Sequence, residues 1–305
     1  MMAGDEIMKT IIDIDKVNKV FKDKKVLMDI SMTIGEGECV ALLGKNGAGK
    51  STLINLILGH YYPTKGNLSL TYGKKEIGFL SQKTRFPDDV TIQEMIDFVS
   101  SFSDNPLSSR EIEMILPFPK KKYQQLVGTC SGGEQRLIDT CLALMNRPKL
   151  LIVDEPTASM DTSTRNHFWQ LIKQLKETGT TILFTTHYVE EVDYCADRVI
   201  LLDQGKIRAD STPYHLRTLN KKKIMIIEND IYESRENSLE SLIKTFNINV
   251  IKDKAVVRWH FKNEVTANLL KNLMEIDFPF ENVELTNTSL LETIFNNNLQ
   301  EGVEI

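Results

Sequence analysis

The chain has 305 residues, with 37 Lys and Arg against 42 Asp and Glu, so its formal net charge is −5. This length is typical of about two domains. A composition of 41% apolar and 26% charged residues excludes a disordered or collagen-like chain. The acidic balance gives no support for a general binder of nucleic acid or of anionic membranes, so we expect no nucleic-acid partner.

Apolar runs in the sequence are strand-length, whereas a membrane-spanning helix needs about 20 consecutive apolar residues. The sequence therefore predicts no spanning helix. Asp5 and Glu6 stand where a signal peptide would carry basic charge. The 4 cysteines are widely spaced and show no metal-binding pattern, which favours free, buried thiols and a cytoplasmic location.

The first part of the chain reads as one α/β domain over residues 8–218. Residues 11–20 and 26–34 alternate evenly and predict half-exposed antiparallel strands. Short apolar runs, separated by helical patterns, predict a largely parallel sheet covered by helices, at 38–43, 150–153, 181–185 and 198–202. Residues 91–130 have helical spacing broken by prolines and predict an inserted helical lobe.

A composition change near Leu219 marks a second, smaller domain over residues 219–305. Its pattern predicts a small α+β unit. We expect strands at 224–227, 255–261 and 282–285, and helices at 238–246, 265–274 and 289–297.

A glycine-rich segment directly after the apolar run 39–43 carries the clearest chemistry. It reads Gly44, Lys45, Asn46, Gly47, Ala48, Gly49, Lys50, Ser51, Thr52. Glycines allow successive backbone N–H groups to face phosphate oxygens, the lysine supplies charge to the outer phosphates, and the serine hydroxyl is a ligand for Mg²⁺. A helix from Thr52 would add its N-terminal dipole. The pattern predicts a nucleotide site.

Two acidic residues, Asp154 and Glu155, end the apolar run that begins at Leu150. Such a run places both carboxylates at the ligand-binding edge of an α/β sheet. We expect Asp154 to hold Mg²⁺ through its water shell and Glu155 to polarise an attacking water. Hydrolysis is therefore expected rather than transfer to a second substrate.

A second anion-binding segment is predicted at Ser131, Gly132 and Gly133, which precede a helical pattern. One chain would then have two phosphate-binding faces, and the second would serve the nucleotide of a neighbouring subunit. An alternative stays open at this point. Ser131 and Glu134 also fit an ordinary helix cap with a capping box.

Together these motifs resemble those of ATP-binding cassette (ABC) proteins, over residues 10–215. Four more positions take their roles from the resemblance alone: Phe21 as the adenine-stacking aromatic, Gln82 as a catalytic and magnesium-binding residue, Asp161 at the cassette dimer, and His187 at the γ-phosphate. The chain departs from the family pattern at Cys130 and Glu134, where the signature has Leu and Gln, and at Met160, where Leu is usual. The Ser-Gly-Gly core is intact, so we expect an active ATPase.

The resemblance implies a P-loop NTPase fold of the ABC ATPase type, with an antiparallel β subdomain and a helical subdomain. It also implies ATP and Mg²⁺, a head-to-tail cassette dimer of one or two kinds of chain, and a separate membrane permease that holds the cassette at the inner face of the membrane. The tail at 283–295 resembles cassettes that serve ABC-2-type permeases, which export drugs, antimicrobial peptides, lipids or polysaccharide. A soluble, non-transport ABC ATPase of the translation or DNA-maintenance type remains the alternative.

An apolar stripe at helical spacing crosses the predicted helical lobe, formed by Met95, Phe98, Val99 and Phe102. Packing inside the core of the lobe is the interpretation that we favour for it. Docking of a permease helix is the alternative.

Overall fold

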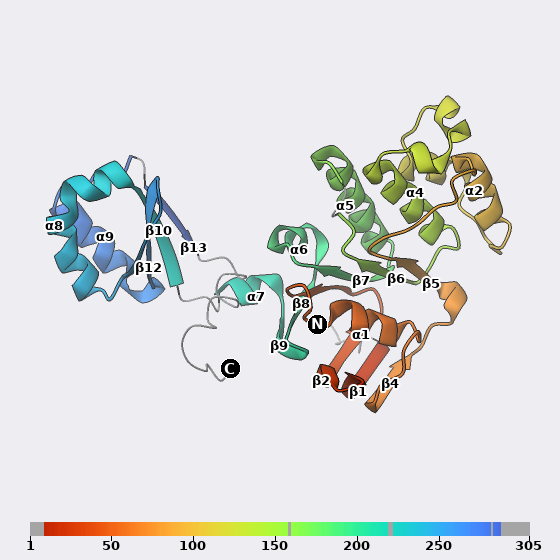
Figure 1. Ribbon diagram of the computed structural model, residues 1–305, viewed down its shortest axis with the longest axis horizontal. Helices are drawn as coiled ribbons and strands as arrows, with labels where there is room; N and C mark the ends of the chain where they lie inside the picture. The colour runs from red at the N-terminus through yellow and green to blue at the C-terminus, as the bar shows by residue number, and fades with distance from the viewer. Residues whose placement is uncertain (1–8, 158–159, 219–221, 282, 288–305) are drawn as a thin grey trace, which may run out of the picture. The chain divides into compact units, whose positions relative to one another are not determined.

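The computed structural model describes residues 9–157, 160–218, 222–281 and 283–287. The chain divides into two compact units, Met1–Pro213 and Tyr214–Ile305 (Figure 1). In the described part of the chain, no helix is both long and apolar enough to cross a membrane.

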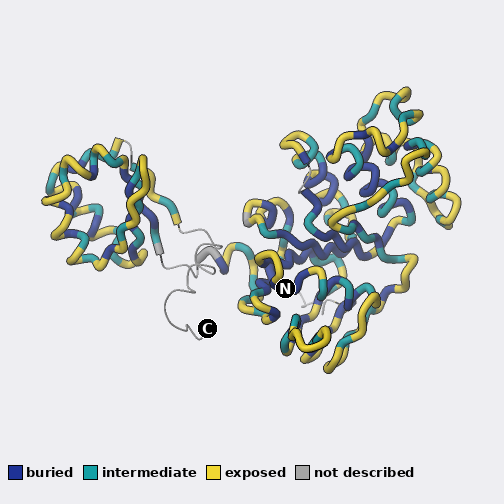
Figure 2. Tube along the Cα trace, viewed as in Figure 1, coloured by how far each residue is buried: buried dark blue, intermediate teal, exposed yellow. Residues whose placement is uncertain are grey.

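A six-stranded sheet forms the centre of the first unit, in the order β5-β6-β7-β3-β8-β9. Its strands are β5 Ile77–Leu80, β6 Leu150–Asp154, β7 Thr181–Thr186, β3 Cys39–Leu43, β8 Arg198–Asp203 and β9 Lys206–Ser211. The first five are parallel, and β9 is antiparallel to β8. Residues of β3, β6 and β7 are buried throughout (Figure 2), as expected for a parallel sheet with both faces covered. The carboxyl ends of these three strands therefore meet at one edge.

Helices of the first unit follow the strands in the order expected for an α/β domain. They are α1 Lys50–Ile57, α4 Gly132–Leu144, α5 Thr162–Glu177 and α6 Val189–Cys195. Helix α1 buries Leu53, Ile54 and Leu56 in the core that it shares with β3. A helix this short is marginal in isolation, so this packing holds it in place.

An antiparallel sheet of three strands, in the order β2-β1-β4, packs on the same core. Its strands are β1 Thr10–Phe21, β2 Lys24–Gly35 and β4 Lys65–Leu70, so the two predicted antiparallel strands are confirmed. Alternate residues of β2, namely Ile30, Met32 and Ile34, are buried in the core. Strand β1 ends at Phe21, and this places the aromatic ring at the rim of the sheet.

The inserted lobe contains α2 Ile92–Ser100 and α3 Ser109–Ile115, followed by 3₁₀ turns at Lys120–Gln124 and Val127–Thr129; a further 3₁₀ turn at Lys74–Glu76 precedes β5. Capping boxes begin both helices. Helix α2 buries Ile92 and Ile96, whereas the side chains of Phe98 and Phe102 are 63% and 69% exposed. Our favoured interpretation of this apolar stripe as lobe core is therefore wrong for its two phenylalanines, because Phe98 lies on the side of α2 away from the buried isoleucines and Phe102 lies in the turn after the helix ends.

The second unit contains a four-stranded antiparallel sheet in the order β11-β12-β10-β13. Its elements run β10 Lys222–Glu228, α8 Asn229–Thr245, β11 Asn249–Lys252, β12 Val256–Lys262, α9 Thr266–Glu275 and β13 Glu284–Asn287, with α7 Pro213–Thr218 before them and a 3₁₀ turn at Asn263–Val265. This order is the split β-α-β arrangement of ferredoxin-like folds. Met225 and Trp259 pair across the sheet and pack against Leu239 and Leu269 of the helices.

Two features of this unit differ from the sequence prediction. Helix α8 begins at Asn229, well before residue 238, because Tyr232 is the one buried residue of its polar first half and gives little periodic signal. Strand β11 was missed, since it has four residues and lies at the sheet edge. The predicted helix at 289–297 lies outside the described residues.

Candidate functional site

The loop between β3 and α1 adopts the conformation that the glycine pattern requires. Gly47 and Gly49 have φ of 83° and 111°, values that favour glycine. A Cβ atom on Gly49 would also lie 2.7 Å from the Leu27 side chain. Helix α1 starts at Lys50 directly after Gly49, which has no side chain to cap it. The first N–H groups of the helix are thus not capped by a side chain and can bind an anion.

Lys50 is held inside this loop by three oxygen atoms. Its Nζ atom donates to the carbonyl oxygens of Gly44, at 2.7 Å, and Lys45, at 3.3 Å. It also lies 3.1 Å from Oε1 of Glu155. The ammonium group is therefore fixed at the mouth of the phosphate loop.

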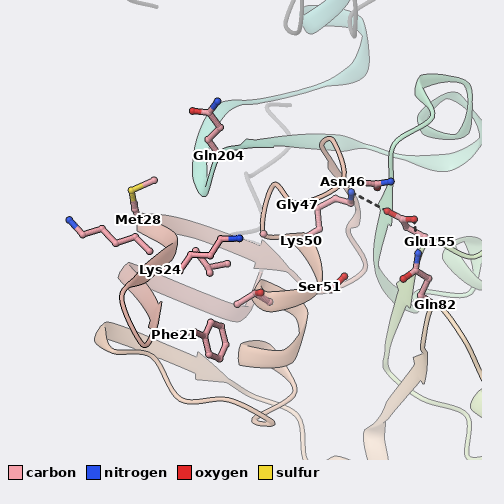
Figure 3. Close-up of a pocket in the computed structure, with 14 residues that line it drawn as sticks. Phe21, Lys24, Met28, Asn46, Gly47, Lys50, Ser51, Gln82, Glu155 and Gln204 are labelled. Carbon is pink, nitrogen blue, oxygen red and sulfur yellow. Dashed lines mark hydrogen bonds and ion pairs between the residues drawn. The ribbon is translucent and has the colours of Figure 1, made fainter. Parts of the chain in front are cut away.

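Glu155 is the residue on which the other predicted catalytic groups converge. Its Oε2 atom accepts a hydrogen bond from Nε2 of Gln82 at 3.0 Å and lies 3.6 Å from Nδ1 of His187. That Nδ1 atom is buried and forms no hydrogen bond within the described chain. Lys50 lies at the other oxygen, Oε1, so the three groups surround a single carboxylate. Figure 3 shows this for Lys50 and Gln82.

Thr185, at the end of β7, orients both acidic residues. Its hydroxyl donates to Oδ1 of Asp154 at 2.5 Å and accepts from the backbone N–H of Glu155 at 2.9 Å. Glu155 has a φ of 44°, which is uncommon for a residue with a side chain. We did not identify Thr185 from the sequence, although a polar residue ending a buried apolar strand was a usable signal.

Arg136 of α4 is a second residue whose part in the site the sequence did not reveal. It is buried, and its guanidinium donates to the backbone oxygens of Pro156, at 3.0 Å, and Asp154, at 3.3 Å. It also pairs with Asp139, 3.1 Å away. Burial lowers the pKa of Arg136 and raises that of Asp139, and their pairing opposes both shifts. The arginine thus ties α4 to the backbone that carries both acidic residues.

A cavity of about 710 Å³ opens beside the loop. Seven of the residues predicted to bind a nucleotide line it, namely Phe21, Asn46, Gly47, Gly49, Lys50, Ser51 and Thr52, together with the predicted catalytic residues Gln82 and Glu155 (Figure 3). Gly44, Lys45 and Ala48 of the same loop are not among the lining residues. Five lining residues, Lys24, Lys25, Val26, Met28 and Gln204, were not predicted, because they come from strand β2 and from the turn between β8 and β9, which only the fold brings to the loop. The volume suits a nucleotide.

Phe21 is supported from outside the cavity lining. The Tyr61 ring meets it edge-on, with centroids 5.2 Å apart. Nζ of Lys19 lies 4.8 Å from the Phe21 centroid and donates to the carbonyl oxygen of Tyr62 at 2.7 Å. These contacts restrict the ring at the open end of the cavity.

Ser131 forms the N-terminal cap of α4, and Glu134 completes a capping box with it. Lys122 pairs with Glu134 and lowers the pKa of that carboxyl. The helix cap that the sequence left open is therefore present. Ser131, Gly132 and Gly133 are not among the residues that line the cavity of their own chain.

Asp161 caps α5, and its Oδ1 atom accepts from the Thr164 N–H at 2.8 Å. This bond lowers the pKa of Asp161. A Cβ atom on Gly133 would lie 3.3 Å from the Thr164 side chain, so the N-terminal ends of α4 and α5 lie close together. Asp161 itself does not line the cavity either.

No group of three or more His, Cys, Asp and Glu residues in the described chain could hold a metal ion by itself. The predicted magnesium-binding residues offer oxygen instead: Ser51 and Gln82 line the cavity, and Asp154 stands at the end of β6. A few oxygen ligands of this kind fit Mg²⁺, which usually takes its other ligands from water and substrate phosphates.

Comparison with known proteins agrees with this geometry. The ABC transporter family model matches residues 27–158. A Nod factor export ATP-binding protein I of Rhizobium sp. (strain N33) is 33% identical over 254 residues, which cover 78% of this chain and 82% of that protein. A linearmycin resistance ATP-binding protein of Bacillus subtilis (strain 168) is 34% identical over 211 residues, covering 65% of this chain and 68% of that protein.

Solved structures show the same fold. The ATP-binding subunit of an ABC transporter, 24% identical, has a TM-score of 0.61 and covers 69% of this chain and 93% of its own. A dimeric bacterial ABC transporter cassette, 25% identical, has a TM-score of 0.58, with coverage of 66% and 98%.

The chain therefore belongs to the ABC transporter family. It is an ATP-binding, ATP-hydrolysing subunit of export type, and the non-transport alternative is not favoured.

Proposed function

We propose that this chain hydrolyses ATP in the cavity beside Lys50 and Glu155 and thereby powers export through a separate membrane permease. The convergence of Lys50, Gln82 and His187 on one carboxylate supports the proposal. In this proposal residues 8–218 form the cassette, residues 219–305 form an accessory domain, and the permease holds the chain at the inner face of the membrane.

Binding begins with the phosphate loop and the aromatic rim. The N–H groups of the loop and of the first turn of α1 face the phosphates. Lys50 supplies a positive charge to them, and in the structure this charge forms an ion pair with Glu155. Phe21 stacks on adenine at the other end of the cavity.

Glu155 acts as the general base and accepts a proton from the attacking water. Gln82 donates to its Oε2 atom at 3.0 Å, and Nδ1 of His187 lies 3.6 Å from the same oxygen. When the outer phosphates draw Lys50 toward them, Oε1 of Glu155 becomes available to the water. His187, at the end of β7, contacts the γ-phosphate.

Mg²⁺ would neutralise phosphate charge and help to align the phosphates for attack. Ser51 would bind it through its hydroxyl, Gln82 through its amide oxygen, and Asp154 through water. The Nε2 atom of Gln82 points to Glu155, which leaves its amide oxygen for the metal.

The segment at Ser131–Gly133 serves the nucleotide of a second cassette, since Ser131 and Gly132 are exposed at the N-terminus of a 13-residue helix and lie away from their own cavity. Glu134 would repel a phosphate, but the capping box and Lys122 engage its carboxylate. Asp161 lies at the same interface. A similar cassette has been solved as a dimer, which supports pairing with a second cassette.

The transported molecule is a drug, an antimicrobial peptide or a lipid-like compound. The support comes from relatives, one named for the export of Nod factor and the other for resistance to linearmycin. The chain itself carries no determinant of this choice in our proposal, because selectivity lies in the permease.

Capture of the permease tests the proposal. A tagged Glu155→Gln variant, purified with ATP from detergent-solubilised native membranes, should retain a polytopic membrane protein. Glu113→Gln, which alters an exposed residue of the helical lobe, serves as the matched control that keeps turnover. Recovery of ribosomes or DNA-binding proteins in place of a membrane protein would contradict the transport role and leave the ATPase chemistry unaffected.

A further inference from the structure

Two cysteines far apart in sequence lie in contact at the amino end of β3, whereas the phosphate loop follows the carboxyl end of this strand. Cys39 is the first residue of β3, and Cys195 is the last residue of α6. Their Sγ atoms are 3.6 Å apart. Both thiols are free, and the residues are 0% and 7% exposed. A disulfide bond has an S–S length of about 2.05 Å, so the two sulfur atoms need to approach by only about 1.5 Å.

The backbone around the two cysteines is held by polar contacts that such an approach need not disturb. Asp197 accepts from the Cys39 N–H at 3.0 Å through its side chain, and its own N–H donates to the Cys39 carbonyl oxygen at 2.8 Å. Nζ of Lys176 donates to the Cys195 carbonyl oxygen at 2.8 Å and to Asp197 at 2.5 Å. The main chains on both sides are therefore fixed, and side-chain rotation is what brings the sulfurs together.

We propose that Cys39 and Cys195 form a reversible disulfide bond that fastens α6 to β3 when the protein meets a peroxide. Neither the ABC family motifs nor the site described above uses these two residues.

The chemistry balances with hydrogen peroxide as the oxidant. The Cys195 sulfur attacks one peroxide oxygen and gives up its proton, the O–O bond breaks, and the hydroxide that leaves takes this proton, so a sulfenic acid and one water form. The Cys39 sulfur then attacks the sulfenic sulfur and releases a second water, so two thiols and one peroxide give one disulfide and two waters. The hydrogen bond to Cys195, and after it burial, raise the pKa of Cys39. Cys195, the more exposed of the two, is therefore the sulfur that reacts first.

The bond would join two parts of the molecule that lead to the nucleotide site. Strand β3 runs into the phosphate loop, and α6 begins two residues after His187. Glu191 of α6 is buried and accepts hydrogen bonds from the hydroxyls of Thr157 and Thr186. Fastening the far end of α6 would thus restrict the segment that holds these contacts.

Peptide mapping of the full chain tests for the bond. The reduced protein is treated with hydrogen peroxide, its remaining thiols are alkylated, and it is digested without reductant for mass spectrometry. We expect the Cys39 and Cys195 peptides to appear joined, and to separate after treatment with dithiothreitol. Cys195→Ala should abolish the joined peptide. Cys141→Ser, which changes a buried cysteine of α4, should leave it in place. Recovery of Cys39 and Cys195 alkylated, or of Cys195 oxidised to a sulfinic acid without a partner, would overturn the proposal.

Hydrogen exchange of the wild-type chain tests the fastening without any variant. Oxidation should slow amide exchange in residues 189–195 by about threefold or more, because the end of α6 can no longer open freely. Exchange that stays unchanged in a chain shown to be fully cross-linked would contradict the restriction of α6.

Discussion

Lys50 and Glu155 form an ion pair of 3.1 Å in which the side chains are only 5% and 10% exposed. Each charge is thus largely removed from water and depends on the other and on nearby polar groups. A pair of this kind is costly to break on one side, because the remaining charge is left without a partner. The residue proposed to bind phosphate and the residue proposed to activate water are therefore physically coupled.

Lys50→Ala should weaken ATP binding by at least about tenfold, since it removes the buried ammonium group that is held at the mouth of the phosphate loop. Equilibrium dialysis with ATP measures this directly. Lys74→Ala, on an exposed 3₁₀ turn, is the control and should bind ATP as the wild-type chain does. Unchanged affinity in Lys50→Ala would contradict the phosphate role.

Thr185→Val keeps the side-chain shape but removes the hydroxyl that contacts both Asp154 and Glu155. We expect kcat to fall by about tenfold, a loss of about 1.4 kcal/mol in transition-state stabilisation, while ATP affinity changes less. Steady-state kinetics and a binding titration separate the two effects. Thr185→Ser, which retains the hydroxyl, should keep most of the activity; equal loss in both variants would rule out the orienting role.

Tyr61→Ala should raise the KM for ATP by about fivefold, because aromatic pairs contribute about 0.5–1.5 kcal/mol and the Phe21 ring loses its support. The kcat should be unchanged. Tyr61→Phe keeps the ring and serves as the control. Competition by inorganic tripolyphosphate, which has no base, should be the same in all three proteins; a loss there would point to general damage to the fold.

Ser131 and Ser108 cap two helices with the same capping box, which allows capping to be separated from catalysis. Aspartate is a good N-cap but would repel a phosphate. Ser131→Asp should therefore keep the thermal midpoint and lose turnover, whereas Ser108→Ala should lower stability by about 1 kcal/mol and keep turnover. Full activity in Ser131→Asp would contradict a phosphate-binding role for this helix end in a second cassette.

The lowered pKa of Glu111 makes the stability of the folded chain depend on pH, and the direction of the pKa shift determines the sign of this dependence. Arg147 and then Ser108 lower its pKa from 4.5 to about 2. The stabilisation is present above pH 4.5 and is lost as the pH falls toward 2. Because the side chains of Glu111 and Arg147 are 36% and 39% exposed, solvent screening limits the effect to about 1 kcal/mol or less. Denaturant titrations should find Glu111→Gln less stable than wild type at pH 7, with the difference vanishing near pH 2.

Local sequence signals were enough to predict the centre of the site. The glycine loop, the run ending in Asp154 and Glu155, and the strand before His187 are each short continuous patterns, and parallel pairing of β3, β6 and β7 brings their ends together. Tyr61 and Gln204 could not be found in this way, because neither belongs to a motif. Only the fold brings Tyr61 against Phe21 and Gln204 to the cavity.

The fold, like the site, has parts that local sequence patterns predict and parts that they do not. Strands β3, β6 and β7 are apolar on both faces and stand out in the sequence. Helix α2 was recognised but its buried side was not, because Phe98 on its exposed side and Phe102 beyond its last turn continue the apolar pattern. A stripe with apolar residues on more than one side does not say which side packs.

The central claim is that Glu155 activates water in the cavity that Lys50 lines. Turnover of ATP by Glu155→Gln, measured beside ATP binding in the same preparation, tests it most directly. The account predicts that phosphate release is abolished while ATP is still bound, since glutamine keeps the side-chain shape but cannot accept the proton. Phosphate release at the wild-type rate in this variant would show that another group is the base and would contradict the mechanism.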